Sequence, residues 1–286
     1  MADLSVIVLT MNEEKNIEKC IKSINEIAQR VIVVDSGSTD KTLDIAKSLG
    51  ADIYHHDFEN YARQFNWGLD NTNITTKWVL RLDADEVIPP ELAEEMTAEM
   101  VAHKDDDING MQLKLKQNFL GKWLMHGGSY PFIKLMLFKH GIGRIEDRKM
   151  DEHTVLSSGK SIMLKNDALH YDFKDITHYI KKHNWYATRE AQDYISMNMS
   201  SSVAALEEGN MKSHRKQKAM YYKAPKFFRA FVLFFYSYFF KLGFLDGKEG
   251  FVYHVLENFW YRFLVDVKIY EYEKTGFIQQ ETGALK

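Results

Sequence analysis

Two carboxylates stand two residues apart directly after a mostly apolar run at residues 78–82, and they belong to Asp83 and Asp85. Carboxylate oxygens bind hard divalent cations such as Mg²⁺ or Mn²⁺, and such a cation can in turn bind a diphosphate. The predicted chemistry is stabilisation of a departing phosphate by a Lewis acid. A solvated acidic turn would have the same sequence, so the argument depends on the other polar clusters that lie in register with this pair.

A second polar cluster follows the apolar residues 31–34 and contains Asp35, Ser38 and Asp40. A carboxylate can accept a hydrogen bond from the imide N–H of a uracil ring, so we expect Asp35 to bind a nucleoside. Ser38 and Asp40 also suit the cap of the next helix. Helix capping does not explain an aspartate at the end of the strand, and this favours a binding role for Asp35.

A third cluster, Thr10, Asn12 and Glu13, follows the apolar residues 5–9. Glu13 can bond a ribose or the edge of a base. The alternative is that Asn12 caps a helix whose first turn contains Glu13. Arg63 falls on a predicted helix, where its planar guanidinium can either reach a diphosphate or lie exposed at the surface.

Candidates for proton transfer come later in the chain. Glu152 lies in a short polar stretch at 150–154 and can act as a general base, or it can be an ordinary loop acid. His153 and His170 can each ligate a metal or hydrogen-bond a phosphate, although a single histidine more often has a structural role.

The elements that position these clusters alternate between strand and helix over the first hundred residues. This pattern predicts a mostly parallel sheet covered by helices, with ligands at the carboxyl ends of its strands. All three clusters fall at such ends, so we expect them to meet in one crevice. The predicted strands are 5–9, 31–34, 51–55, 78–82, 111–116, 134–138 and 162–171, the clearest predicted helices are 61–70, 89–103 and 179–197, a linker is expected at 200–218, and a turn between two helices at 243–250.

The composition is that of a globular protein: 286 residues, 45% hydrophobic and 27% charged. The single cysteine, Cys20, excludes a disulfide framework and a multi-cysteine metal site. The net charge of −3 argues against a polycation that binds nucleic acid. Because the N-terminus lacks a secretory signal and the longest apolar run, 230–240, is too short to span a bilayer, we expect a cytoplasmic protein.

Three ordered motifs, together with their spacing, strongly resemble family 2 glycosyltransferases, and the resemblance covers about residues 3–175. Residues 64–69 also look like the helix that precedes the acidic strand in that family. The segments 151–153, 169–171 and 179–187 are most similar to a bacterial subgroup that includes lipopolysaccharide core β-glucosyltransferases. The three motifs are residues 6–13, 33–40 and 82–86.

The resemblance implies a GT-A fold, α/β with a Rossmann-like, mostly parallel central sheet. We expect this domain over residues 1–200 and a helical extension over 201–286. It further implies a nucleotide-sugar donor, usually a UDP-sugar, a divalent metal (Mg or Mn) and inversion at the anomeric carbon. The sugar would be glucose or a related hexose, and the acceptor a lipopolysaccharide, a lipid-linked saccharide or a cell-surface glycan.

The same resemblance assigns roles to individual residues. Asp35 would contact the uracil, Asp83 the ribose or the metal, and Asp85 would be the main metal ligand. Glu152 would deprotonate the acceptor hydroxyl, and His170 would be a third metal ligand or a diphosphate contact. The subgroup usually has a histidine where this chain has Asp151, so Asp151 and Glu152 both remain candidates for the base. The remaining donor-site candidates are Thr10, Asn12, Glu13, Ser38 and Arg63.

The last third of the chain is basic and aromatic. Residues 209–245 contain no Asp or Glu, and lysines and arginines alternate there with Tyr and Phe. This composition is typical of a helix in an anionic lipid interface, which favours a peripheral protein on the inner face of the cytoplasmic membrane. The alternatives are packing against residues 252–270, contact within a homo-oligomer and, least favoured, a single-strand nucleic-acid groove.

Other classes of protein fit less well. A HAD-like phosphatase would also use an aspartate pair such as Asp83 and Asp85, but its strand normally opens the domain, whereas three strand–helix units precede this one. A sugar nucleotidyltransferase would need a glycine-rich basic loop in place of residues 10–13. A dinucleotide-binding dehydrogenase would need a G-x-G-x-x-G motif, which is absent. A non-catalytic carbohydrate-binding partner at the membrane would bind the donor without turnover.

Overall fold

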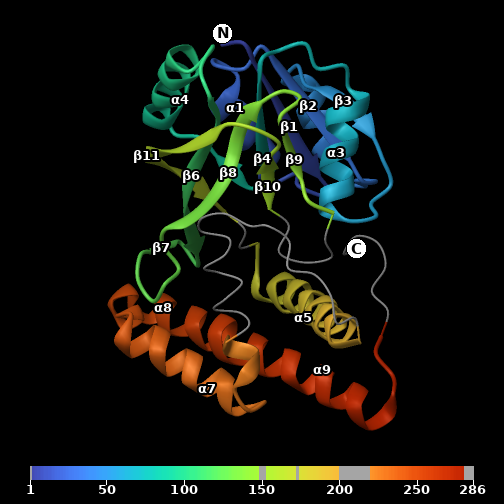
Figure 1. Cartoon of the computed structure of the whole chain (residues 1–286), viewed down its shortest axis with the longest axis vertical. Helices are drawn as coiled ribbons and strands as arrows, with labels where there is room; N and C mark the ends of the chain where they lie inside the picture. The colour runs from blue at the N-terminus through green and yellow to red at the C-terminus, as the bar shows by residue number, and fades with distance from the viewer. Residues whose placement is uncertain (1, 148–152, 172–173, 200–219, 280–286) are drawn as a thin grey trace.

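The computed structural model describes residues 2–147, 153–171, 174–199 and 220–279, and within these residues a nine-stranded sheet forms the centre of the molecule (Figure 1). The strand order is β3-β2-β1-β4-β8-β6-β11-β5, with β7 paired to β6. Helices cover both faces of the sheet, and a second group of helices lies beyond one of its ends (Figure 1). The fold is therefore of the mixed α/β type that the sequence predicts.

The parallel part of the sheet is built from four strands. Continuous apolar runs form them because parallel strands are buried on both faces. The register pairs Thr10 with Asp35 and Leu9 with Asp83, so neighbouring strands end together at one edge. These strands are β1 (Leu4–Thr10), β2 (Arg30–Asp35), β3 (Asp52–His55) and β4 (Trp78–Asp83).

The connecting helices bury apolar residues at helical spacing. In α1, Ile17, Cys20, Ile21 and Ile24 face the sheet and are fully buried. One core cluster contains residues of α1 and α4, and a second cluster contains residues of α3. These helices are α1 (Ile17–Ile24), α2 (Thr42–Ser48), α3 (Tyr61–Asn71) and α4 (Pro90–Ala102).

The other half of the sheet mixes directions. β8 (Phe132–Lys139) runs antiparallel to both β4 and β6 (Ile108–Phe119), while β11 (Lys160–His170) is parallel to β6. β6 and β8 are longer than the predicted 111–116 and 134–138. The short strands are β5 (Glu86–Val87), β7 (Lys122–Leu124), β9 (Gly143–Ile145) and β10 (Thr154–Leu156); the last two pair with each other.

The C-terminal helices form a layer of their own at one end of the molecule (Figure 1). The long helix α5 (Ile176–Met199) packs against α9 (Arg262–Thr275), where Ala187, Ala191, Val265 and Ile269 are buried together. The turn expected at 243–250 is wrong in position: the break lies at residues 241–242, because residues 243–246 form a 3₁₀ helix and an α-helix begins at Gly247. The remaining elements are α7 (Phe228–Phe235), the π-helix η1 (Tyr236–Phe240), the 3₁₀ helix η2 (Gly243–Asp246), α8 (Gly247–His254) and the π-helix η3 (Val255–Tyr261).

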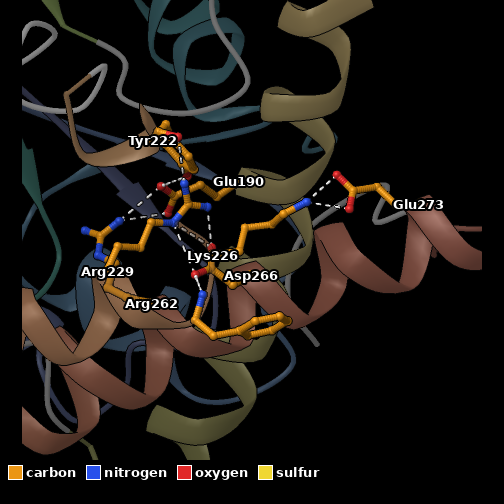
Figure 2. A network of polar contacts seen from close by, with 8 residues as sticks. Glu190, Tyr222, Lys226, Arg229, Arg262, Asp266 and Glu273 are labelled. Carbon is orange, nitrogen blue, oxygen red and sulfur yellow. Dashed lines mark hydrogen bonds and ion pairs between the residues drawn. The ribbon is translucent and has the colours of Figure 1, made fainter. Parts of the chain in front are cut away.

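A polar network fastens this layer (Figure 2). Arg229 on α7 pairs with Asp266 on α9, and both side chains are buried. Glu190 on α5 accepts hydrogen bonds from Tyr222, Tyr261 and Arg262. Because such buried charges are stable only when paired, the network fixes α5, α7 and α9 in one arrangement.

Candidate active site

The carboxylate of Asp35 is the centre of the turn after β2. It accepts hydrogen bonds from the Thr10 hydroxyl (3.0 Å), the Gly37 amide (2.8 Å) and both the amide (2.9 Å) and the hydroxyl (2.5 Å) of Ser38. Gly37 has a φ of 99°, a conformation that only glycine adopts without strain. Asp35 is 1% exposed, so the structure shows it anchoring the turn, and its contact with uracil stays a prediction.

Asn12 joins the loop after β1 to the same turn. Its amide donates to the Ser38 hydroxyl (2.9 Å), and its side-chain oxygen accepts from the Thr39 amide (2.9 Å). The cap position of α1 is Asn16, so the alternative in which Asn12 caps this helix is wrong. Asn12 has a φ of 55° and bridges two loops instead, because the chain turns once more before the helix begins.

Glu13 faces the acidic motif. Its carboxylate accepts from Lys174 (2.5 Å) and from the Asn16 side chain (2.8 Å). Burial raises the pKa of Glu13, and the negative charge of Asp85 raises it further, while Lys174 acts in the opposite direction. The loop after β1 therefore lies close enough to the loop after β4 for the charge of Asp85 to act on Glu13.

Asp83 is held ionised by buried cations. Its carboxylate accepts from the Tyr61 hydroxyl and lies 3.5 Å from the Lys134 ammonium. Arg81 donates to the Tyr61 oxygen (2.8 Å) and stacks over the Tyr61 ring at 4.4 Å. Burial by itself would raise the pKa of Asp83, but the charges of Lys134 and Arg81 outweigh it and lower the pKa to about 2.

Glu86 and Lys134 contact each other and Asp83. The Lys134 ammonium lies 3.0 Å from one Glu86 oxygen, and the other Glu86 oxygen accepts from the Asp83 amide at 2.9 Å. Glu86 is 0% exposed. Burial raises the pKa of Glu86, and Lys134 counteracts part of this rise. This buried pair fixes the backbone of the acidic motif.

Asp85 and His170 lie side by side at the acidic motif, and both side chains are mostly buried. The Nε2 atom of His170 lies 3.5 Å from an Asp85 oxygen, and the Tyr171 amide donates to the Asp85 carbonyl at 2.8 Å. This contact arises because β11 pairs with β5, which sets His170 opposite Glu86. Asp85 and His170, which the resemblance assigns to one metal site, are therefore neighbours in the structure, and their role as metal ligands stays a prediction.

The residues at this edge fit a divalent cation in part. Asp85 and His170, whose Oδ2 and Nε2 atoms lie 3.5 Å apart, are ligand-type groups that lie together at this edge. Within the described residues, no group of three or more His, Cys, Asp or Glu could hold one. A carboxylate and an imidazole suit Mn²⁺ or Mg²⁺ when diphosphate oxygens and water complete the coordination.

Two other predicted groups lie to the side. Arg63 at the start of α3 pairs with Glu59 (2.5 Å) and Asp147 (3.0 Å), and its side chain is 53% exposed. Asn60 also donates to Asp147 at 3.0 Å. The base candidates Asp151 and Glu152 fall outside the described residues.

Sequence reasoning missed several residues of this site: Tyr61, Arg81, Glu86, Lys134 and Lys174. Arg81 carried a signal, because a charged residue in the middle of a buried strand needs a partner. Lys134 carried a weaker signal of the same kind in the predicted strand 134–138. Their partners come from other strands and helices, so only the assembled sheet identifies them.

The fold and the converging acidic loops define a GT-A enzyme of the kind that transfers a sugar. Residues 5–171 match the family model for glycosyl transferase family 2, and the chain belongs to this family. The match removes the reason to consider a phosphatase at Asp83 and Asp85.

Relatives carry matching names. An uncharacterized glycosyltransferase of Rickettsia typhi is 30% identical over 203 residues, which cover 68% of this chain and 69% of the relative. A lipopolysaccharide core biosynthesis glycosyltransferase of Rhizobium meliloti, LpsC, is 27% identical over 67% of this chain and 72% of that protein.

One solved structure is a more distant neighbour. Glucosyl-3-phosphoglycerate synthase of Mycobacterium tuberculosis, solved with Mn²⁺, uridine diphosphate and glucosyl-3-phosphoglycerate, is 23% identical with a TM-score of 0.33. The overlap covers 40% of this chain and 44% of that chain. An overlap of this extent adds nothing to the fold assignment, which rests on the strand order and the family match.

Proposed function

We propose that this family 2 glycosyltransferase moves glucose or a related hexose from a UDP-sugar to a lipopolysaccharide, lipid-linked or cell-surface glycan acceptor, with inversion at the anomeric carbon. The observation that carries the proposal is the shared ending of β1, β2 and β4. It brings the Asp35 turn and the acidic motif to one edge of the sheet. The name of LpsC supports the choice of acceptor.

The donor would lie across these strand ends. The loops containing Thr10, Asn12, Asp35 and Ser38 are cross-linked by hydrogen bonds, so they would offer the nucleoside a preorganised surface. Asp85 and His170 would hold the divalent cation, which, when bound, supplies charge stabilisation to the leaving diphosphate. Asp83, kept ionised by its buried partners, would accept a hydrogen bond from the ribose.

Transfer would be a single in-line displacement. Glu152 would take the proton of the acceptor hydroxyl as that oxygen attacks C1 of the sugar from the face opposite UDP. The C1–O bond to the diphosphate breaks, and the diphosphate leaves with the electron pair. Asp151 is the alternative base.

The part of the chain that leads to these acids is anchored next to the site. Asn60 and Arg63 bind Asp147, and Tyr61 between them binds Asp83. Arg63 would then act as a positioning residue for the segment that carries the base, rather than as a contact to the diphosphate. The enzyme would work at the inner face of the cytoplasmic membrane, where lipid-linked acceptors are found.

Calorimetric titration of the purified chain with UDP, with and without Mn²⁺, tests the donor site. We expect binding that depends on Mn²⁺ and exceeds binding of GDP and ADP. Protein that is folded by circular dichroism and binds none of the three nucleotides would contradict the proposed function. Equal binding of all three would contradict the UDP assignment alone.

A further inference from the structure

The segment formed by α7 and η1 turns its apolar side away from the protein. Phe228, Phe235 and Phe240 are 63%, 52% and 79% exposed. The opposite side holds Arg229, Ala230 and Ser237, which are buried. The exposed residues recur at intervals of three and four, which places them on one helical face. They are Phe228, Phe231, Val232, Phe235, Tyr236, Phe239 and Phe240.

A second arm extends this surface. The chain bends after η1 at Leu242, which has a φ of 62°, and η2 and α8 follow. Rings connect the two arms, with Tyr238 6.3 Å from Phe244 and 5.6 Å from Phe251. We call the exposed residues of both arms the apolar ridge; the second arm contributes Leu242, Phe244, Leu245 and Phe251. Exposed apolar patches of this extent mark interaction sites.

The charges around the apolar ridge are positive. Residues 220–245 contain no Asp or Glu, and Lys223, Lys241 and Lys248 are exposed. Asp246 is 2% exposed and is bonded to His126, so its charge is not presented to a partner. The first partly exposed acid after this stretch is Glu249. A basic rim around an apolar face complements anionic lipid headgroups.

The length and composition of the two arms also fit a bilayer. No single described helix is long and apolar enough to cross a membrane. Phe228–Phe240 and Gly243–Thr275 taken together are long and apolar enough, with a bend of 72° between them. The core helices of other proteins can be equally long and apolar, but their apolar residues are buried. The residues of the apolar ridge are exposed. The first arm rises about 20 Å, less than the roughly 30 Å of a bilayer's apolar core.

We propose that the apolar ridge inserts into one leaflet of an anionic lipid bilayer as a bent hairpin that enters and leaves on the same side. Aromatic side chains would lie among the acyl chains, and the lysines of the rim would lie among the headgroups. The lipid contact itself follows from the ridge alone. Its use, to bring the site to a membrane-borne acceptor, rests on the proposed function.

The hairpin is joined directly to the active-site half of the molecule. Asp246 accepts from the amides of Met125 (3.0 Å) and His126 (2.9 Å), and Gly127 donates to the Lys241 carbonyl (2.8 Å). Eight residues after His126, Lys134 contacts Asp83. A Cβ at Gly127 would lie 2.0 Å from the His254 ring, so the two parts are in close contact. Insertion of the apolar ridge would therefore set the distance between the site and the membrane.

The single cysteine makes a direct test feasible, because Cys20 is fully buried and a new surface cysteine would be the accessible thiol. The full chain carrying Phe240→Cys is labelled with the environment-sensitive dye NBD and mixed with vesicles of phosphatidylcholine and phosphatidylglycerol. We expect a blue shift and quenching by spin-labelled lipid. The matched control is Val101→Cys on α4, which is 72% exposed and distant from the ridge, and its dye should not respond.

A loss-of-binding variant completes the test. Phe228→Ser, Phe235→Ser and Phe240→Ser combined should lower the vesicle partition coefficient at least about tenfold, because burial of aromatic side chains supplies the affinity. Val101→Ser with Met163→Ser, both at exposed apolar positions, should leave it unchanged. Exposed side chains contribute little to the core, so both variants should fold.

Two results would overturn the proposal. One is an NBD response at position 240 that appears without vesicles and grows with protein concentration, together with a dimer in sedimentation velocity; the ridge would then bind a second copy of the chain. The other is no response of folded protein to any vesicle. Titration of the same variants with UDP and Mn²⁺ separates the two proposals, since the serine variants should keep donor binding. If the unmodified chain binds vesicles but does not bind UDP, only the proposed function is contradicted.

Discussion

At the scale of single residues, the site is a balance of buried charges. Glu86 is buried, Asp83 is partly buried, and Lys134 contacts both. The Lys134 ammonium stabilises these carboxylates more than it would at the surface, because an unpaired carboxylate here would lose its hydration without compensation. Asp85 lies 3.5 Å from His170 and is the acid that we propose as the main metal ligand.

Asp85→Ala tests this division of roles. Removal of the carboxylate should weaken the Mn²⁺-dependent part of UDP binding by at least about tenfold, because hard cations depend on carboxylate oxygens. Calorimetric titration with and without Mn²⁺ measures it. Asp105→Ala is the control, since Asp105 is 81% exposed and pairs with Lys77 away from the site. Undiminished Mn²⁺-dependent binding in Asp85→Ala would rule Asp85 out as a ligand.

Glu152→Gln tests the base. A glutamine keeps the shape but cannot take a proton, so we expect donor binding to persist while transfer falls by about 10²-fold or more. Asp151→Asn, one residue earlier, is the matched control and should retain most activity. Transfer can be followed as UDP released in the presence of membrane extract. Normal transfer by Glu152→Gln together with a loss in Asp151→Asn would assign the base to Asp151.

At the scale of elements, the C-terminal helices are held by polar contacts as much as by apolar ones. α7 is joined to α9 by a buried pair, Arg229 with Asp266, and Lys226, just before α7, pairs with the exposed Glu273 of α9 (Figure 2). The ring of Phe231 also contacts Phe259 and Phe263. The buried pair is the polar part of this attachment.

Asp266→Asn and Glu273→Gln compare the two pairs. The first leaves Arg229 buried without a counter-ion and should cost about 3–5 kcal/mol of unfolding free energy. The second breaks a pair in which Glu273 is 45% exposed and should cost about 0–1 kcal/mol. Urea unfolding followed by circular dichroism measures both. Equal losses would show that the buried pair does not hold α7 in place.

Glu257 joins η3 to α5 and makes stability depend on pH. Burial would raise the pKa of Glu257, but the hydrogen bonds from His183 and Tyr179 outweigh it and lower the pKa. The folded pKa therefore lies below the unfolded value of about 4.3, so the stabilisation is present above that pH and is lost as the pH falls through the folded pKa.

Glu257→Gln should therefore cost about 1–3 kcal/mol at about pH 6, and the difference from the unmodified chain should shrink below about pH 4. Urea unfolding across this range measures the difference. Glu271→Gln, at an exposed acid on α9, serves as the control and should show no such trend. A difference that stays constant with pH would mean that the carboxylate's ionisation is not the source of its contribution.

At the scale of the whole molecule, the sheet and the helical layer meet at a few defined contacts. Apolar packing joins Phe119 and Leu124 of the β6–β7 hairpin to Tyr179 and Tyr253. Beside it, Asp246 binds the chain directly after β7. This junction connects the apolar ridge to the strand that carries Lys134.

Asp246→Ala should loosen the junction without unfolding either part. The amides of Met125 and His126 lose their acceptor, so we expect their hydrogen exchange to become at least about tenfold faster. Glu249→Ala, a neighbouring and more exposed acid, is the control. Peptide-level exchange followed by mass spectrometry measures the effect. Unchanged exchange at residues 125–126 would show that Asp246 does not hold this loop.

The sequence by itself determined the local elements and the acidic loops. Buried parallel strands leave continuous apolar runs, and α1 and α3 leave helical periodicity, so both are legible in a short window. The three motifs also predicted the family. Asp85 and His170, far apart in the chain, were both candidates before their contact was known.

Only the tertiary structure decided which of these distant residues are in contact. Lys134, Glu86 and Tyr61 gather around Asp83 because separate strands and a helix converge there, and no local pattern encodes such pairings. Asn12 was a donor-site candidate with a helix cap as the alternative, and the structure shows it bridging two loops. The aromatic stripe of α7 was visible as composition, but whether it faced a core or the outside depended on the position of α9. The direction in which a helix turns its apolar face is settled by its neighbours, and this is why the ridge had to be seen in the folded chain.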